Sequence, residues 1–247
     1  NIDAYIKNTK DLLFSVPTPM GANFGNEVMT NIGEMMNKGV EFAFNFIPVQ
    51  TKDWSVQVGV NGTFQNTVFN KIRGGDSEDD FIEVTGLDFG TGTKLSRHQV
   101  GYAPYSYYVY QQLYDTEGKA IQNAFVDRND DGVITEADKY FAGDPNPDFY
   151  YGLNFKASYK NWDFGFNGHG SIGYTVYNAF AAGNSTSSFD VNAGNLSNYA
   201  TVVKKTGFTA PNKLAQYVSD YFLEDASFFR MDDINLGYTF KEIGNWG

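Results

Sequence analysis

The residues best suited to bind a ligand lie in the stretch DRNDDGVITEAD, which spans residues 127–138. Oxygen-bearing side chains recur along it, and Gly132 stands where a loop that wraps a cation needs a sharp turn. Twelve-residue calcium loops place their ligands at positions 1, 3, 5, 7, 9 and 12. The corresponding ligands here are Asp127, Asn129, Asp131, the carbonyl of Val133, Thr135 and Asp138. The spacing therefore predicts a site for calcium or an equivalent hard cation.

The sequence around this loop favours a structural ion over a calcium sensor. A sensor reorients two helices that flank its loop, whereas Pro145 and Pro147 follow this loop and end any helix there. Asp138 also stands where such loops usually have the longer, bidentate Glu. We therefore expect an ion that pins a long loop against its neighbours. The alternative is an acidic surface turn without an ion, because Asp, Asn and Gly are common in turns.

Two further patterns bear on cofactors and catalysis. GHGSIG, residues 168–173, matches the glycine spacing of dinucleotide-binding loops, and Asp190 follows about twenty residues on. The segment before it alternates apolar and polar residues, and YTVYNAF is a poor start for a packed helix. We interpret these glycines as small residues in a strand, with His169 on the polar face. His98 is the other histidine, and no GxSxG motif surrounds a serine. We predict that the chain is not an enzyme.

Composition limits the partners and the kinds of site that the chain can have. The 247 residues carry a net charge of −11, which repels phosphate backbones, so we expect no nucleic acid as a partner. The absence of cysteine excludes a disulfide framework, a zinc ribbon and a thiol nucleophile. No apolar run approaches the ~20 residues of a membrane helix. Aromatic residues make up 17% of the chain and must be placed by the fold.

Alternation of apolar and polar residues is the main structural signal, because successive side chains of a strand face opposite sides of a sheet. The opposite faces are small or polar, as in a barrel lumen. Adjacent carboxylates such as Asp232 and Asp233 should then lie on opposite faces. The aligned apolar residues are Val40, Phe42, Phe44 and Phe46; Trp54, Val56, Val58, Val60 and Phe64; Phe149, Tyr151, Leu153, Phe155 and Tyr159; Trp162, Phe164, Phe166 and Ile172; and Ile234, Leu236, Tyr238 and Phe240.

Connection lengths predict the topology. Short links alternate with long links rich in Gly, Asn, Asp and Ser, so every short turn lies at one end of the sheet. We predict an all-β fold, an antiparallel up-and-down meander forming part of a large transmembrane β-barrel with long extracellular loops. The chain begins and ends abruptly, and we interpret it as one partial barrel domain, 1–247, of a longer protein. The predicted strands are 1–14, 38–47, 54–66, 148–160, 162–173 and 228–240, and the long loops are 15–37, 67–147 and 174–227.

Some alternatives remain open at this point. A secreted, calcium-stabilised β-sandwich for adhesion or glycan binding shares the alternation. Within the long loops, residues 105–114 are strand-like, and 213–223 is the best helix candidate. The loop tyrosines either stack on sugar rings or a lid, or cover hydrophobic neighbours. These tyrosines are Tyr105, Tyr107, Tyr108 and Tyr110.

Several segments together resemble one family. NTKDLLFSVPTP, NIGEMMNKGVEFAFNF, the run from VDRNDDGVITEAD to NGHGSIG, and YFLEDASFFRMDDINLGYTF are similar to the C-terminal barrel region of SusC/RagA-type TonB-dependent transporters of Bacteroidetes. The pattern DxNxDGxIxxxDxxxxGxPxPxFxYG is the most specific part. The likeness runs from about residue 5 to 240 and is weak at 70–110 and 175–215.

The resemblance implies an importer of large nutrients, glycans or peptides, in the bacterial outer membrane, with its loops facing the cell exterior. Its implied partners are a SusD-like surface lipoprotein, the TonB complex acting through a plug region outside this segment, membrane lipid, and the cargo. The resemblance identifies no substrate-binding residue.

Overall fold

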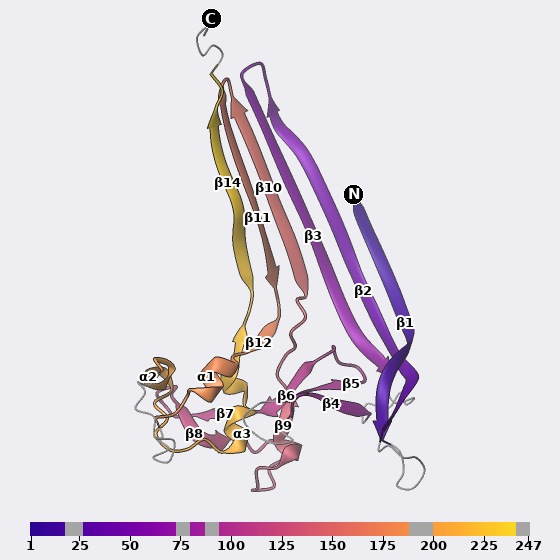
Figure 1. Cartoon of the computed structure of the whole chain (residues 1–247), viewed down its shortest axis with the longest axis vertical. Coiled ribbons are helices and arrows are strands. Elements are labelled where there is room, and N and C mark those ends of the chain that lie inside the picture. The colour runs from indigo at the N-terminus through magenta and orange to yellow at the C-terminus, as the bar shows by residue number, and fades with distance from the viewer. Residues whose placement is uncertain (18–26, 73–79, 87–93, 188–199, 241–247) are drawn as a thin grey trace, which may run out of the picture.

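Six long strands form one antiparallel sheet in the computed structural model, which describes residues 1–17, 27–72, 80–86, 94–187 and 200–240 (Figure 1). The sheet order is β1-β2-β3-β10-β11-β14, so each strand pairs with its nearest long neighbour along the chain. This meander is a single sheet and not the two facing sheets of a sandwich. The bounds are β1 Ile2–Pro17, β2 Glu27–Gln50, β3 Trp54–Lys71, β10 Phe149–Tyr159, β11 Trp162–Ile172 and β14 Phe228–Tyr238.

The strand register confirms the predicted faces, because residues directly opposite in antiparallel strands point to the same side. One apolar row crosses five strands, and the polar row beside it is shifted by one residue in each strand. The apolar row is Phe46, Val58, Phe155, Phe166 and Ile234. The polar row is Asn45, Gly59, Asn154, Asn167 and Asp233. The sheet therefore has one apolar and one polar face.

The first two strands are longer than the sequence predicts, so the expected loop 15–37 is wrong throughout its described part, 15–17 and 27–37. β1 runs to residue 17 and β2 already begins at residue 27. β3 likewise continues to Lys71, five residues beyond 66, where the predicted strand ends. This region lacks clear alternation, but ladder pairing extends it: Met35 lies opposite Phe69, and Met36 opposite Val68. Backbone pairing to a neighbour can hold a strand whose side-chain pattern is weak.

The connections divide between the two ends of the sheet as predicted. The β2–β3 link comprises residues 51–53 and the β10–β11 link residues 160–161, and both lie at the upper end in Figure 1. The described parts of the long connections, 72–148 and 173–227, lie at the opposite end. The chain between β1 and β2, from 18 to 26, is outside the described residues.

The two longest connections fold together into what we call the loop module, the described residues of 80–148 and 173–227. Its main sheet has the order β4-β5-β6-β9, and shorter pairs join β7 to β8 and β12 to β13. The strands are β4 Phe81–Gly86, β5 Lys94–Gln99, β6 Ser106–Tyr110, β7 Gln112–Tyr114, β8 Ala120–Phe125, β9 Lys139–Phe141, β12 Thr175–Tyr177 and β13 Leu223–Asp225. The predicted long loops thus contain much regular structure.

Helical structure in the module is short. The expected helix within 213–223 is one turn, α3 Leu214–Tyr217, followed by the 3-10 turn η3 Asp220–Phe222. α3 ends because the Val218 carbonyl accepts a hydrogen bond from the backbone of Tyr110 at 2.9 Å, which draws the chain into extended pairing. The other helical segments are α1 Ala179–Gly183, α2 Val202–Thr206 and the 3-10 turn η1 Glu136–Asp138. Among the described residues, no helix is long and apolar enough to cross a membrane.

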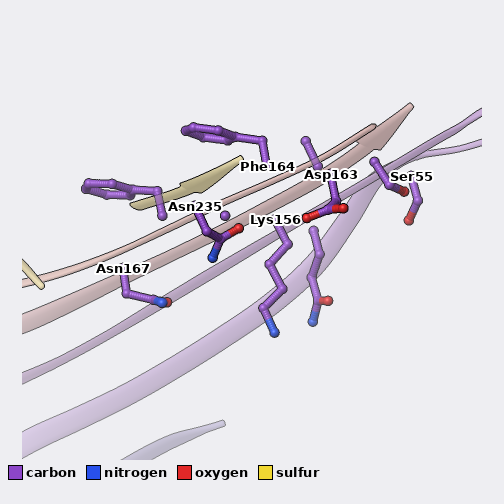
Figure 2. A pocket seen from close by; sticks show the side chains of 11 residues that line it. Ser55, Lys156, Asp163, Phe164, Asn167 and Asn235 are labelled. Carbon is purple, nitrogen blue, oxygen red and sulfur yellow. The ribbon is translucent and has the colours of Figure 1, made fainter. Parts of the chain in front are cut away.

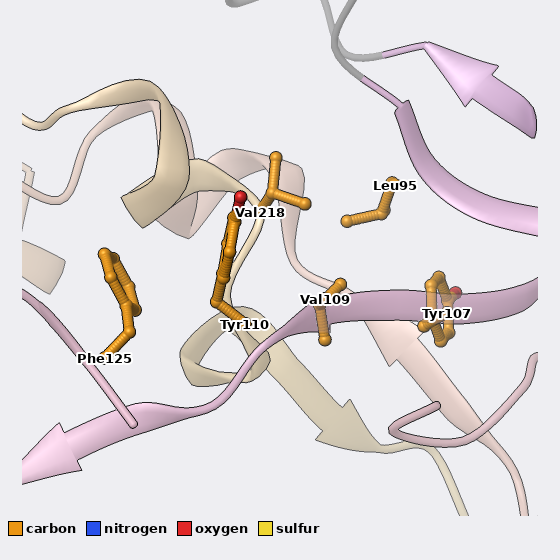
Figure 3. Packing of buried hydrophobic residues seen from close by; sticks show 6 residues of the cluster. All are labelled: Leu95, Tyr107, Val109, Tyr110, Phe125 and Val218. Carbon is orange, nitrogen blue, oxygen red and sulfur yellow. The ribbon is translucent and has the colours of Figure 1, made fainter. Parts of the chain in front are cut away.

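The buried core lies largely in the loop module and not in the sheet. One cluster packs Leu95, Tyr107, Val109, Tyr110, Phe125 and Val218 (Figure 3). A second packs Ala120, Ala181, Ala182, Phe208 and Phe222, and so joins both long connections. A third, Phe69, Ile72 and Val100, joins the end of β3 to the module. By contrast, outer strands keep large apolar side chains exposed, such as Leu236 at 70%.

Candidate functional site: the acidic loop and its surroundings

The first half of the acidic loop, residues 127–133, is folded by its own side-chain oxygens. Asp127 Oδ2 accepts a hydrogen bond from the backbone N–H of Gly132 at 2.7 Å, which closes the turn. Gly132 has φ of +82°, a conformation that favours glycine. Asn129 Nδ2 donates to Asp131 Oδ2 at 2.9 Å, and Asp131 Oδ1 accepts from the Val133 backbone at 2.8 Å. The side chains at positions 1, 3 and 5 thus gather on the inside of one turn.

Asp138 closes the second half of the loop from a fully buried position. Its Oδ2 accepts from the Thr135 backbone N–H at 2.7 Å, and its Oδ1 from the Arg128 backbone N–H at 2.9 Å. These hydrogen bonds, with that of Thr135 foremost, hold the pKa of Asp138 below its ordinary value although burial opposes them. Thr135 also caps η1, because its hydroxyl accepts from the backbone of Ala137. The shorter carboxylate at position 12 therefore fits a role as a backbone clamp.

The loop supplies the donor chemistry of a hard-cation site without a preformed cage of carboxylates. Within the described part of the chain, no group of three or more His, Cys, Asp or Glu side chains is arranged to hold a metal. Asp127, Asp131 and Asp138 all accept hydrogen bonds from backbone N–H groups of the loop itself. The backbone turn fits a cation, but the carboxylates would have to reorient around it. The ligand roles of the six residues stay a prediction.

Strands flank the loop, since β8 precedes it and β9 follows it directly, while the 3-10 turn η1 forms its last three residues. The loop is tied to both neighbours. Lys139 Nζ lies 2.7 Å from Glu136 Oε2, and the Tyr110 hydroxyl donates to Glu136 Oε1 at 3.1 Å. Arg128 donates to Gln111 Oε1 at 2.8 Å. These contacts fasten the acidic loop to the core cluster of Figure 3, so a bound cation would stiffen an already anchored segment.

Two buried glutamines join the two long connections, and sequence reasoning did not find them. Gln216 Nε2 donates to Gln112 Oε1 at 2.6 Å, and Gln216 Oε1 accepts from the backbone of Asn123 at 2.6 Å. Both side chains are buried, Gln216 completely. Gln112 Nε2 in turn donates to three backbone carbonyls, those of Leu113, Ile121 and Ala124. No local pattern marks this pair, because its members lie 104 residues apart.

The polar face of the sheet carries its own charged group. His169 Nδ1 lies 2.6 Å from Asp232 Oδ2, and Arg230 Nε lies 4.0 Å from Asp232 Oδ1. The prediction that Asp232 and Asp233 face opposite sides is wrong. A bulge between Gly168 and Asn167 gives β14 one extra residue, Asp232, so both carboxylates point to the polar face.

A shallow pocket of about 210 Å³ lies on the sheet near the short turns. In Figure 2, Lys156 and Asn167 extend to one side of the strands and Phe164 to the other. Asp163 and Asn235 also line it. The figure shows the two unlike faces of the sheet directly, and the pocket offers polar contacts without a reactive constellation.

The GHGSIG segment is part of a strand and opens no helix. β11 covers residues 168–172, and the strand β12 follows. A Cβ at Gly170 would lie 2.5 Å from the Tyr151 ring, so the glycine gives room to a neighbouring aromatic side chain. His169 lies opposite Arg230 on the polar face, as predicted. The interpretation as small residues in a strand is confirmed.

Of the four loop tyrosines, two are buried in the core and two are exposed or line a groove. Tyr107 and Tyr110 are buried in the core cluster, and therefore cover hydrophobic neighbours. Tyr105 is 49% exposed, and Tyr108 lines an open groove on the module. Sequence spacing alone could not separate them, because strand twist and the second connection decide which rings are covered.

The fold indicates the class of protein: the chain is part of the wall of an antiparallel up-and-down barrel, with a folded loop module at one end of the sheet. No protein-family profile matches the chain. It is 40% identical to the TonB-dependent receptor SusC of Bacteroides thetaiotaomicron, over 98% of this chain and 24% of that protein. The TonB-dependent receptor P3 of Formosa agariphila is 28% identical over 98% of this chain and 25% of that protein.

Solved structures show the same fold. The RagAB peptide transporter superposes with a TM-score of 0.68 at 19% identity, over 96% of this chain and 26% of that one. The RagAB importer in its 'open-open' state gives a TM-score of 0.69. The chain belongs to the SusC/RagA-type TonB-dependent receptors. It spans about a quarter of the length of SusC and of receptor P3.

Proposed function

We propose that this chain forms part of the wall and the outer loops of an outer-membrane transporter that imports glycans or peptides. The observation that carries the proposal is the pair of unlike faces, one apolar and one polar, on a sheet whose long connections share one end. Such a sheet suits a barrel with lipid on one side and an aqueous lumen on the other. The relatives support it, since they are TonB-dependent receptors and not enzymes, and we propose no catalytic role.

The loop module lies outside the cell in this proposal, and the short turns face the periplasm. Short turns at the inner end and long loops at the outer end are the usual arrangement of such barrels. We further propose that a SusD-like surface lipoprotein covers the loop end, and that the TonB complex acts through a plug domain. These two partners rest on family membership.

Single cysteines test the orientation, because the chain has no native cysteine. Val133, 60% exposed in the acidic loop, and Lys52, in the β2–β3 turn, lie at opposite ends of the sheet. In the full-length transporter, Val133→Cys should react with an impermeant maleimide on intact cells. Lys52→Cys should react only after the outer membrane is opened. The reverse pattern would contradict the proposed orientation.

Import is tested in cells that lack the full-length gene. Uptake of labelled oligosaccharides and of labelled peptides should be compared before and after complementation. We expect one of the two cargo classes to depend on the gene. If uptake of each cargo class is the same in cells with and without the gene, the transport proposal is contradicted.

We also propose that the acidic loop binds calcium as a structural ion. Asp127, Asn129, Asp131, Val133, Thr135 and Asp138 would supply the oxygens, and the ion would hold the loop without signalling. The support is the closed turn at Gly132 and the gathered side chains of positions 1, 3 and 5. Chelation with EDTA should raise protease sensitivity at 115–147 and leave the sheet intact, as followed by circular dichroism.

A matched pair of variants tests the ligand assignment. Asp127→Asn removes a charge at position 1, whereas Asp130→Asn removes one at position 4, which is not a ligand position. Calorimetry on the full-length protein should show that calcium binding weakens by about tenfold or more in the first variant only. Equal weakening in both would indicate general charge attraction, and loss of global β structure in EDTA would contradict a local role.

A further inference from the structure

An open groove of about 660 Å³ lies on the loop module beside the acidic loop, whose Arg128 forms part of its lining. The strands β4, β5, β6 and β9 are neighbours in one sheet (Figure 1). Each of the four contributes side chains to the lining of the groove. Its cations are Arg97, Arg128 and Lys139, and its described lining includes no Asp or Glu. The whole chain has 29 acidic and 18 basic residues, so the absence of acids from the described lining is a local exception.

Arg97 is the central feature of the groove. Its guanidinium carbon lies 4.0 Å from the centre of the Phe81 ring and 3.4 Å from that of Tyr108, so two rings fix its plane. Its charged contacts are long: Nη2 lies 3.9 Å from Glu83 Oε1, and Nη1 lies 3.5 Å from Gln99 Oε1. Its buried Nε has no hydrogen-bond partner.

These contacts leave Arg97 with donor capacity that the described protein does not use. Burial lowers the pKa of Arg97 from its ordinary value, and the nearby Tyr108 and Glu83 only partly compensate. The donors that a ligand can use are Nη1 and Nη2, whose present contacts are long, because a guanidinium matches a carboxylate or sulfate with two parallel hydrogen bonds. The other two cations already have partners within the protein, since Lys139 forms an ion pair with Glu136 and Arg128 lies over the ring of Tyr140.

Aromatic surface adjoins this anion-binding group. Tyr102 and Phe141 stack with centroids 3.6 Å apart, and Tyr102 remains 39% exposed. Phe81 is 37% exposed at the other side of Arg97. Flat rings of this kind bind the apolar faces of sugar rings, while an adjacent cation binds an acidic substituent. An acidic peptide would use the cation but has less need of flat rings.

We propose that this groove binds a saccharide that carries carboxylate or sulfate groups. Arg97 takes the anionic substituent, and Tyr102 and Phe81 contact the sugar rings. The binding requires the folded loop module and no transport step, so it stands apart from the proposed import. The groove is then a site for acidic sugars on the surface of the loop module, outside the barrel lumen.

Calorimetry on the full-length transporter in detergent tests the groove with three probes: trigalacturonate, neutral maltotriose and the peptide triglutamate. We expect trigalacturonate to bind more tightly than the other two. Arg97→Gln should weaken that binding by about tenfold or more, because a bidentate charged contact is lost. Arg97→Lys should also weaken it, since the fork geometry is lost while the charge stays.

Two further variants keep the test decisive if Arg97→Gln impairs folding. Tyr102→Leu changes an exposed ring and should weaken trigalacturonate binding by a few fold, while Arg230→Gln, on the polar face of the sheet, should leave it unchanged. Equal or tighter binding of triglutamate would assign the groove to peptides and overturn the proposal. So would binding of trigalacturonate that is insensitive to both Arg97 and Tyr102. Uptake, measured separately in cells, reports on import alone.

Discussion

The buried glutamine pair gives the sharpest test of the loop module as one folded unit. Gln216 comes from the second long connection and Gln112 from the first, and Gln216 also holds the backbone of Asn123. Gln216→Leu keeps the approximate volume and removes both polar atoms. The Asn123 N–H then lacks its acceptor, and Gln112 Oε1 lacks its donor.

The cost follows from burial. Each buried polar group left without a partner costs about 1–3 kcal/mol, so two cost about 2–6 kcal/mol. The added apolar burial of leucine offsets about 1–2 kcal/mol of this. A net loss of about 1–4 kcal/mol corresponds to amide protection lowered by about 5- to 700-fold, at 1.4 kcal/mol per tenfold.

Hydrogen exchange followed by mass spectrometry on the full-length protein measures this loss by segment. We expect protection to fall together in 112–125 and 213–223, and to stay unchanged in β10 and β11. Gln57→Leu, at an exposed position on the polar face of the sheet, is the matched control and should change protection little. Protection lost in only one of the two connections would refute the view that the glutamines join them.

Three further predictions concern the sheet, the pH response and the acidic loop. Ile234→Arg, on the apolar face, should cost about 2–4 kcal/mol in lipid vesicles, whereas Asn235→Arg, on the polar face, should cost little; urea unfolding compares them. Burial lowers the pKa of His98, so its contribution to stability is complete above the unfolded value of 6.5 and is lost as pH falls through the lowered folded pKa. Proteolysis of 94–106 should therefore rise on acidification, and His98→Gln should flatten that rise. Gly132→Ala should cost about 1–2 kcal/mol locally because φ is +82°, and a protease rate at 127–138 that matches the unsubstituted protein would contradict this.

Strong alternation made the sheet predictable, and weak alternation marked where prediction failed. The rows through Phe155 and Phe166 repeat every second residue, so their shared face needed no tertiary information. The extension of β2 back to residue 27 depends on hydrogen bonding to β1 and β3, which local composition does not encode. The bulge at Asp232 is of the same kind, since it appears only when β14 is aligned with β11.

The candidate sites show the same division. The spacing of Asp127, Asn129 and Asp131 is local, and so is the turn that gathers them. The use of Asp138 as a buried backbone clamp depends on the short 3-10 turn before it, and the groove around Arg97 depends on four strands that meet only in the folded module.

The amino-acid sequence by itself determined the two faces of the sheet and the ligand-like spacing of DRNDDGVITEAD, because both are patterns within a few residues. It also determined the alternation of short and long connections, because the alternating segments mark where each connection begins and ends. Only the tertiary structure decided that the described residues of 80–148 and 173–227 pack into one module, with most of the buried core in that module. The contacts that build it, such as Gln112 with Gln216, join residues too far apart in the chain for local propensity to pair them.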